Sequence, residues 1–212
     1  MPMQNRVDPE GQLHATSARG LFMGNRGCLH DAQRRLTCRK PPTRRWIICL
    51  TEFRGRKREV MAPGRYAELF FLDEATALSA GHRPCYECRR ADALAFASAA
   101  ARSLGCSHLN ADALDAQLAT QRARPSQDPA RRIDADTCAA LPVGSCIRAG
   151  HSLLMRAASG WLPWSFEGYG PPINPAALAS GTVWRVTPPL AVAALAFGYP
   201  PLLHPTAVAA RA

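Results

Sequence analysis

Two cysteines at zinc-ligand spacing, Cys85 and Cys88, lie in the segment AGHRPCYECRR (residues 80–90) together with three arginines. A C-x₂-C turn lets two thiolates reach one ion while neighbouring backbone N–H groups hydrogen-bond to the sulfurs. A redox pair has the same spacing, but it would lie between a strand and a helix of a βαβ unit, and the first half of the chain lacks that alternation. We therefore interpret the segment as half of a zinc site, with buried or idle thiols as the alternative. The three arginines would favour thiolate over thiol.

Four upstream residues could complete such a site. Cys28 and His30 form a C-x-H pair in a glycine-containing turn, and Cys38 lies in a loop. Cys49 follows two isoleucines in a predicted strand, where a small core residue is the more common role for a cysteine. The upstream ligands therefore stay open among these four. Our prediction is a structural Zn²⁺ with four protein ligands and no open coordination position, held by Cys28, His30, Cys85 and Cys88.

The predicted elements around these residues are short. β-Branched and aromatic residues predict strands over residues 20–25, 44–53, 58–61 and 63–71, and the second and third strands form a hairpin.

Capping residues place three helices near the cysteines. Asp73 is the predicted N-cap of the first helix, and Gly81 stands where a C′ glycine would end it. A second helix starts near Cys88 and closes at Gly105. A third begins after Asn110, which is its predicted N-cap.

The second half of the chain has a different texture. Polar residues and prolines over 124–137 predict a linker. Short apolar stretches separated by turn residues predict a β-meander over 141–172 and a strand over 182–186. A last helix has Thr187 as its N-cap and ends at Gly198. We predict an α+β fold with these parts: an N-terminal arm (1–19), a zinc module with a helical extension (20–123), the linker (124–137) and a β-rich unit closed by a helix (138–212).

Positive charge concentrates in the N-terminal part. The net charge is +10, and residues 26–65 hold twelve lysines and arginines against three acids. Aromatic residues interleave with these charges, a combination that suits a phosphate backbone and stacked bases. A solvated hairpin face would show the same pattern. We predict a nucleic-acid partner that binds Arg44, Arg45, Trp46, Arg54, Arg56, Lys57 and Arg58.

The segment ELFFLDEATALSAGHRPCYECRR resembles the end of the zinc-binding module at the N-terminus of Ada, the bacterial methylphosphotriester repair protein. In that family a phenylalanine-bearing strand leads into a helix of the type EEA-x-x-AG and then into RPC-x-x-C. The stretch GNRGCLH is similar to the GN…YH opening of related Ada-like modules. The resemblance covers residues 20–92 and implies a zinc-stabilised module.

The chain departs from the Ada pattern at the upstream ligands. Ada carries a C-x₃-C pair, and one of those cysteines accepts the methyl group, whereas Pro42 stands here where a partner of Cys38 would be. Transfer of an alkyl group from a DNA phosphotriester to a zinc thiolate, on Cys38 or Cys28, therefore stays an alternative activity, and whether the protein is an enzyme stays open. The C-terminal half is similar, through LPVG, WSFEGYG, TPP and HPTA, to bacterial proteins with this knuckle, which implies no reaction.

The densest aromatic patch contains Trp161, Trp164, Phe166 and Tyr169. Core packing is its more common role, and a pocket for a small molecule or a protein partner is the alternative. The first twenty residues lack the apolar region of a signal peptide, and no apolar run reaches the roughly 18 residues of a membrane helix. We therefore expect a cytoplasmic protein with reduced cysteines and no membrane partner.

Overall fold

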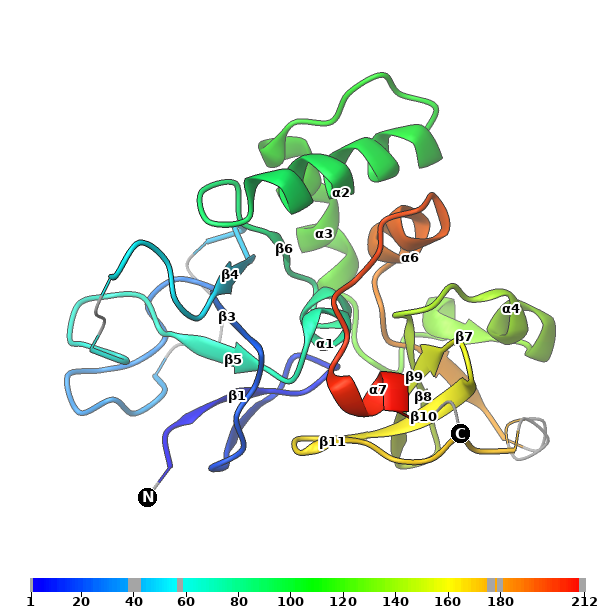
Figure 1. Ribbon diagram of the computed structural model, residues 1–212, viewed down its shortest axis with the longest axis horizontal. Helices are drawn as coiled ribbons and strands as arrows, with labels where there is room; N and C mark the ends of the chain where they lie inside the picture. The colour runs from blue at the N-terminus through cyan, green and yellow to red at the C-terminus, as the bar shows by residue number, and fades with distance from the viewer. Residues whose placement is uncertain (1, 38–42, 57–58, 175–177, 179–180, 210–212) are drawn as a thin grey trace.

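The computed structural model shows an α+β protein with two six-stranded sheets, which confirms the predicted fold class (Figure 1). The residues that it describes are 2–37, 43–56, 59–174, 178 and 181–209.

The first sheet has the strand order β2-β1-β5-β3-β4-β6. Its central strand β3 runs antiparallel to β4 and β5, whereas β1 pairs with β5, and β4 with β6, in parallel. Two of these strands lie within the predicted N-terminal arm. The bounds are β1 (Gln4–Val7), β2 (Leu13–Ala15), β3 (Phe22–Asn25), β4 (Ile47–Leu50), β5 (Leu69–Phe71) and β6 (Arg83–Pro84).

The strand predicted over residues 58–61 is wrong for its described part. Residues 59–61 form no strand, and Met61 has a left-handed backbone with φ of 55°. The Met61 N–H donates to a carboxylate oxygen of Glu68 at 2.7 Å, so a side chain satisfies it in place of a ladder partner. The chain still reverses in a tight turn, where the N–H of Arg56 donates to the carbonyl oxygen of Phe53.

The predicted helices near the cysteines are confirmed as α1 (Glu74–Ser79), α2 (Arg90–Ser103) and α3 (Ala111–Arg122). Asp73 caps α1 by accepting from the N–H of Thr76 at 2.9 Å, and Asn110 caps α3 in the same way. Gly81 follows α1 with φ of +80°, a conformation that glycine adopts without steric cost.

The second sheet has the order β11-β10-β9-β8-β12-β7. The segment predicted as a linker is not an extended connection: it contains a 3₁₀ turn, strand β7 and the start of helix α4. Strand β7 pairs with β12 and thereby becomes part of the second sheet. The bounds are β7 (Arg132–Ile133), α4 (Ala135–Ala140), β8 (Cys146–Ala149), β9 (Ser152–Ala157), β10 (Gly160–Ser165), β11 (Gly168–Tyr169) and β12 (Val183–Arg185).

The last long helix, α6 (Pro189–Ala196), packs on the N-terminal half and also, through Val192, against the apolar cluster of the second sheet that contains Ile147. Its residues Leu190 and Ala194 share a core with Phe96 of α2, and α6 lies beside α2 and α3 (Figure 1). The predicted N-cap Thr187 is wrong by one residue, since Pro188 occupies that position. The Thr187 hydroxyl instead accepts from the N–H of Cys146 at 2.7 Å. A short helix α7 (Pro205–Ala209) follows.

Among the helices of the described residues, none combines the length and the apolar character that crossing a membrane requires.

Candidate metal centre

Three cysteines converge at one edge of the first sheet. Cys49 lies on β4, and Cys85 and Cys88 lie in the turn between β6 and α2. Their Sγ atoms are all within 4.8 Å of one another. Thiolates bound to one tetrahedral zinc ion at about 2.3 Å would be roughly 3.8 Å apart, so the three side chains fit such an ion after small movements.

Backbone pairing explains why Cys49 meets the knuckle. Strand β6 lies parallel to β4, with Ile48 opposite Pro84, and the N–H of Cys85 donates to the carbonyl oxygen of Ile48 at 2.9 Å. Proline keeps the preceding residue extended, which continues this short strand up to the knuckle. Cys49 is therefore next to Cys85 across the sheet, although the two are 36 positions apart in the sequence.

The knuckle presents N–H groups to its own sulfurs. The N–H of Glu87 points to the Sγ of Cys85 at 3.4 Å, and the N–H of Arg89 closes the turn on the carbonyl oxygen of Cys85 at 3.0 Å. Such N–H···S contacts stabilise negative sulfur, as they do in ligand shells of zinc.

The thiols titrate as a group. A hydrogen bond from the Cys49 thiol and further bonds from backbone N–H groups together lower the pKa of Cys85 to about 5, against the opposing effect of burial. The same thiol, together with the N–H of Leu50, lowers the pKa of Cys88. Hydrogen bonding to both neighbours and burial raise the pKa of Cys49. Two sulfurs therefore favour the thiolate form that a metal requires.

The arginines of the knuckle contribute less to this than the sequence suggested. Arg83 forms a bidentate ion pair with the buried Asp115 at 2.8 and 2.9 Å. Arg89 pairs with the buried Glu74 at 2.9 Å. Because Asp115 and Glu74 already compensate the charges of Arg83 and Arg89, hydrogen bonds to the sulfurs are the main reason that the thiolate forms of Cys85 and Cys88 are favoured.

The donor set favours a borderline-soft ion. Cys49 and Cys85 are buried, and Met23, Ile47 and Phe70 pack around them. Cys88 is only partly buried. Three thiols in an apolar shell suit zinc better than a hard cation, which prefers oxygen ligands.

The structure brings together two of the four predicted ligands. Cys28 and His30 do not belong to the cysteine group. Cys28 is exposed, with its Sγ 3.5 Å from the carbonyl oxygen of His30, and the His30 ring is buried with its Nδ1 3.0 Å from the carbonyl oxygen of Asp31. The alternative ligand Cys38 lies outside the described residues. Cys49, which the sequence favoured as a core residue, is both buried and a member of the group.

The predicted nucleic-acid-binding residues frame the same strand. Arg44, Arg45 and Trp46 precede β4, and a turn with Arg54 and Arg56 follows it, whereas Lys57 and Arg58 lie outside the described residues.

The turn after β4 is attached to the knuckle. The guanidinium groups of Arg54 and Arg56 lie 5.0 and 5.4 Å from the centre of the Phe53 ring. Arg56 also pairs with Glu87, between the two knuckle cysteines, at 2.5 Å.

Trp46 is placed differently from the prediction. Its ring is already in contact with the guanidinium groups of Arg26 and Arg122, 4.1 and 4.0 Å from the ring centre. Its indole N–H donates to the carbonyl oxygen of Thr43 at 3.1 Å. The ring faces are therefore less available for stacking on a base than a solvent-exposed tryptophan would be.

The C-terminal aromatic residues do not form one patch. Trp161 packs in one apolar cluster, whereas Trp164 and Tyr169 belong to another, because residues 161 and 164 point to opposite faces of β10. The Tyr169 hydroxyl donates to the buried carboxylate of Asp73 at 2.9 Å. The core role, which the sequence favoured, is confirmed for the buried Trp161 and Tyr169.

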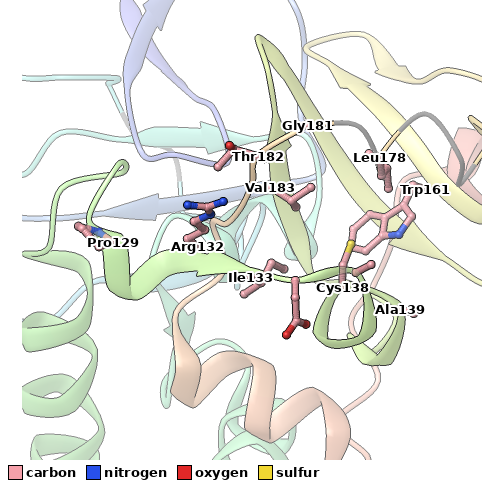
Figure 2. A pocket seen from close by; sticks show the side chains of 12 residues that line it. Pro129, Arg132, Ile133, Cys138, Ala139, Trp161, Leu178, Gly181, Thr182 and Val183 are labelled. Carbon is pink, nitrogen blue, oxygen red and sulfur yellow. The ribbon is translucent and has the colours of Figure 1, made fainter.

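A cavity of about 560 Å³ lies beside Trp161, between β7, α4 and β12. Figure 2 shows Cys138 next to the indole ring and Arg132 farther along the lining, near Thr182. Its size falls within the range of small-molecule sites, so the binding-module alternative has a cavity here, lined by one aromatic ring rather than four.

Comparison of the chain with models of protein families, with curated proteins and with solved structures finds no match.

Proposed function

We propose that this chain is a zinc-dependent nucleic-acid-binding protein in which the ion has a structural role. The observation that carries the proposal is the ion pair between Arg56 and Glu87, because it connects the basic turn to the cysteine knuckle. A metal that orders the knuckle would thereby order the turn.

Strand β4 supports the same conclusion. It carries Cys49, and basic residues stand at both of its ends: Arg44 and Arg45 before it, Arg54 and Arg56 after it. An ion bound to Cys49 would fix the position of the strand and both basic stretches. Arg44, Arg45, Arg54 and Arg56 are exposed, which suits contacts with phosphates.

Zinc is the proposed ion, with Cys49, Cys85 and Cys88 as ligands. These three thiolates leave one position of a tetrahedral ion for a fourth ligand, and neither Cys28 nor His30 lies in the cysteine group. An Ada-like module would have such a structural centre, and we keep that resemblance as part of the proposal.

Salt-dependent binding tests the nucleic-acid part. Each phosphate contact with duplex DNA contributes about −0.9 to the slope of log affinity against log salt concentration. The double variant Arg54→Ala/Arg56→Ala should therefore bind a DNA duplex more weakly and with a slope smaller by about 2. The control Arg102→Ala removes an exposed charge at the far end of α2 and should bind as the parent does.

Two results would contradict the proposal. One is a double variant with the affinity and salt slope of the parent for both DNA and RNA. The other is purified protein without bound zinc that binds as tightly as zinc-loaded protein.

The partial exposure of Cys88 favours a second candidate, the Ada-type alkyl acceptor. Its sulfur would attack the methyl carbon of a phosphotriester, forming an S–C bond and breaking the C–O bond, so that a phosphodiester anion leaves. Mass spectrometry after incubation with methylated DNA decides, since the absence of a methyl adduct on every cysteine excludes this activity.

A further inference from the structure

A polar cavity of about 390 Å³ lies away from the cysteines, between the turn at residues 10–12, the ends of α1 and α3, and the loop that follows α3. Trp46 forms part of its wall. Its charged lining residues are Glu10, Arg122, Arg124 and Arg131. Three arginines against one acid leave an excess of positive charge in a space of ligand size.

The arginines of the lining are only partly compensated by acids: Asp128 pairs with Arg124 and, with Glu10, also acts on Arg131. Arg122 donates to the carbonyl oxygens of Gly81 and Arg44 at 3.2 and 2.7 Å, which satisfies N–H groups without neutralising the charge. Arg124 is exposed, and its Nη1 is 3.6 Å from Asp128. Arg131 donates to the carbonyl oxygens of Val186 and Arg124, and its Nε is buried with no partner within the described part of the chain.

A fourth arginine lies behind the wall. Arg26 is 5% exposed; its Nη1 donates to the carbonyl oxygen of Gly11 at 2.8 Å and its Nε to the ring of His82 at 3.2 Å. Its Nη2 is buried and has no hydrogen-bond partner among residues that the structure describes. Gly11 lines the cavity, and a Cβ at this position would be 3.3 Å from this Nη2, so the Arg26 guanidinium lies close behind the glycine.

These charges are held at an electrostatic cost. Burial, and then the neighbouring Arg122, lower the pKa of Arg26 to about 9, and burial lowers the pKa of Arg122 to about 10. Burial also raises the pKa of Glu10, the one acid among the described lining residues, against the opposing effect of its partner Arg148 at 3.3 Å. A bound anion would compensate this excess, and a dianion would do so better than a carboxylate.

We propose that this cavity binds a phosphate monoester group, held by Arg122, Arg124 and Arg131 with Arg26 behind them. The arginines offer forked N–H donors that match phosphate oxygens, and the polar wall excludes a purely apolar ligand. The site is independent of the proposed metal function, because none of its residues belongs to the cysteine group. The phosphate could belong to a small molecule or to the end of a nucleic acid.

Calorimetric titration at constant ionic strength tests the site with three probes: inorganic phosphate, adenosine 5′-monophosphate, and a short oligonucleotide with or without a 5′-phosphate. Arg124→Ala should weaken phosphate binding about tenfold, since one charge-assisted contact is lost. Arg124 is exposed, so the variant should keep the fold and melting temperature of the parent. Arg102→Ala is the charge-matched control and should bind as the parent does.

NMR of the arginine Nε–H groups provides a second readout. Phosphate should shift the signals of Arg26 and Arg131 in the parent. Binding of inorganic phosphate and adenosine 5′-monophosphate identifies a small-molecule site. If only the oligonucleotide gains affinity from its 5′-phosphate, and this gain is lost in Arg124→Ala, the ligand is the end of a nucleic acid. No saturable binding of any phosphate probe in the millimolar range, or equal affinity in Arg124→Ala and the parent, would overturn the proposal.

Discussion

Glu74→Gln should destabilise the protein strongly, because Glu74 is the buried partner of the arginine that follows the knuckle. The Glu74 side chain has no exposure, and that of Arg89 is 1% exposed. Glu74 accepts hydrogen bonds from the Nη2 of Arg89 at 3.0 Å, from the Tyr199 hydroxyl at 2.6 Å and from the N–H of Leu202 at 3.0 Å, and its Oε1 lies 2.9 Å from the Nη1 of Arg89 as an ion pair. The carboxylate thus joins α1, the knuckle and the C-terminal segment.

The size of the effect follows from the charge that remains. Removing one partner of a buried ion pair costs about 3–5 kcal/mol, because the other charge is left uncompensated. Asp92 still contacts the Nε of Arg89 at 2.8 Å but is partly exposed, so we expect the lower end, about 3 kcal/mol. For a chain of this length, that corresponds to a melting temperature lower by about 6–12 °C.

Urea unfolding with Tyr199→Phe as a control separates charge from hydrogen bonding. That variant removes one hydrogen bond but keeps the ion pair, and should cost only about 1 kcal/mol. Added salt should leave the difference between Glu74→Gln and the parent nearly unchanged, since a buried pair is weakly screened. If Glu74→Gln unfolds at the same urea concentration as Tyr199→Phe, the carboxylate is not what compensates Arg89 and the reasoning fails.

Two further predictions concern the metal centre and pH. Cys49→Ser should lower both the zinc content of the purified protein and its melting temperature, because it removes one of the three sulfurs. The control Cys106→Ser, at an exposed cysteine outside the group, should change neither. Equal zinc content in the two variants would contradict the site. Burial, and then the charges of Arg26 and Arg122, lower the pKa of His82 well below 6.5, so the unfolded chain binds the proton first and stability falls as pH drops below 6.5. The contribution of His82 to the free energy of unfolding falls by up to about 1.4 kcal/mol for each pH unit below 6.5. His82→Gln should therefore make the free energy of unfolding less dependent on pH on the acid side, and an unchanged slope would refute this.

Local sequence signals predicted the elements around the knuckle well. Asp73 and Asn110 cap their helices as expected because capping depends on one side chain and an N–H three residues away. The proline before Cys85 likewise determines an extended approach through local sterics alone.

The third cysteine could not be identified locally. The alternation of side chains along the predicted strand did not determine which face of the sheet Cys49 would occupy. Only the parallel pairing of Ile48 with Pro84 places Cys49 beside Cys85. That pairing joins residues far apart in the sequence, and a two-residue strand such as β6 has no periodicity of its own. The Trp46 contacts were missed for the same reason, since Arg26 and Arg122 reach the ring from distant segments.

The metal centre is coupled to the rest of the molecule because successive knuckle residues contact different elements. Arg83 pairs with Asp115 on α3, Glu87 with Arg56 in the basic turn, and Arg89 with α1 through its buried acid. The pairs of Arg83 and Arg89 are buried, and such pairs contribute little net stability although breaking one is costly, so they specify where the segment must lie more than they hold it there. The pair of Arg56 with Glu87 is exposed and contributes less. The attachment to β4 has two parts: the backbone pairing of β6, with the N–H of Cys85 donating to the carbonyl oxygen of Ile48, and the thiol group. Loss of a bound ion would therefore remove only the sulfur contacts, while the backbone pairing of β6 with β4 and the buried ion pairs persist. The first consequence should be a change in the basic turn rather than global unfolding.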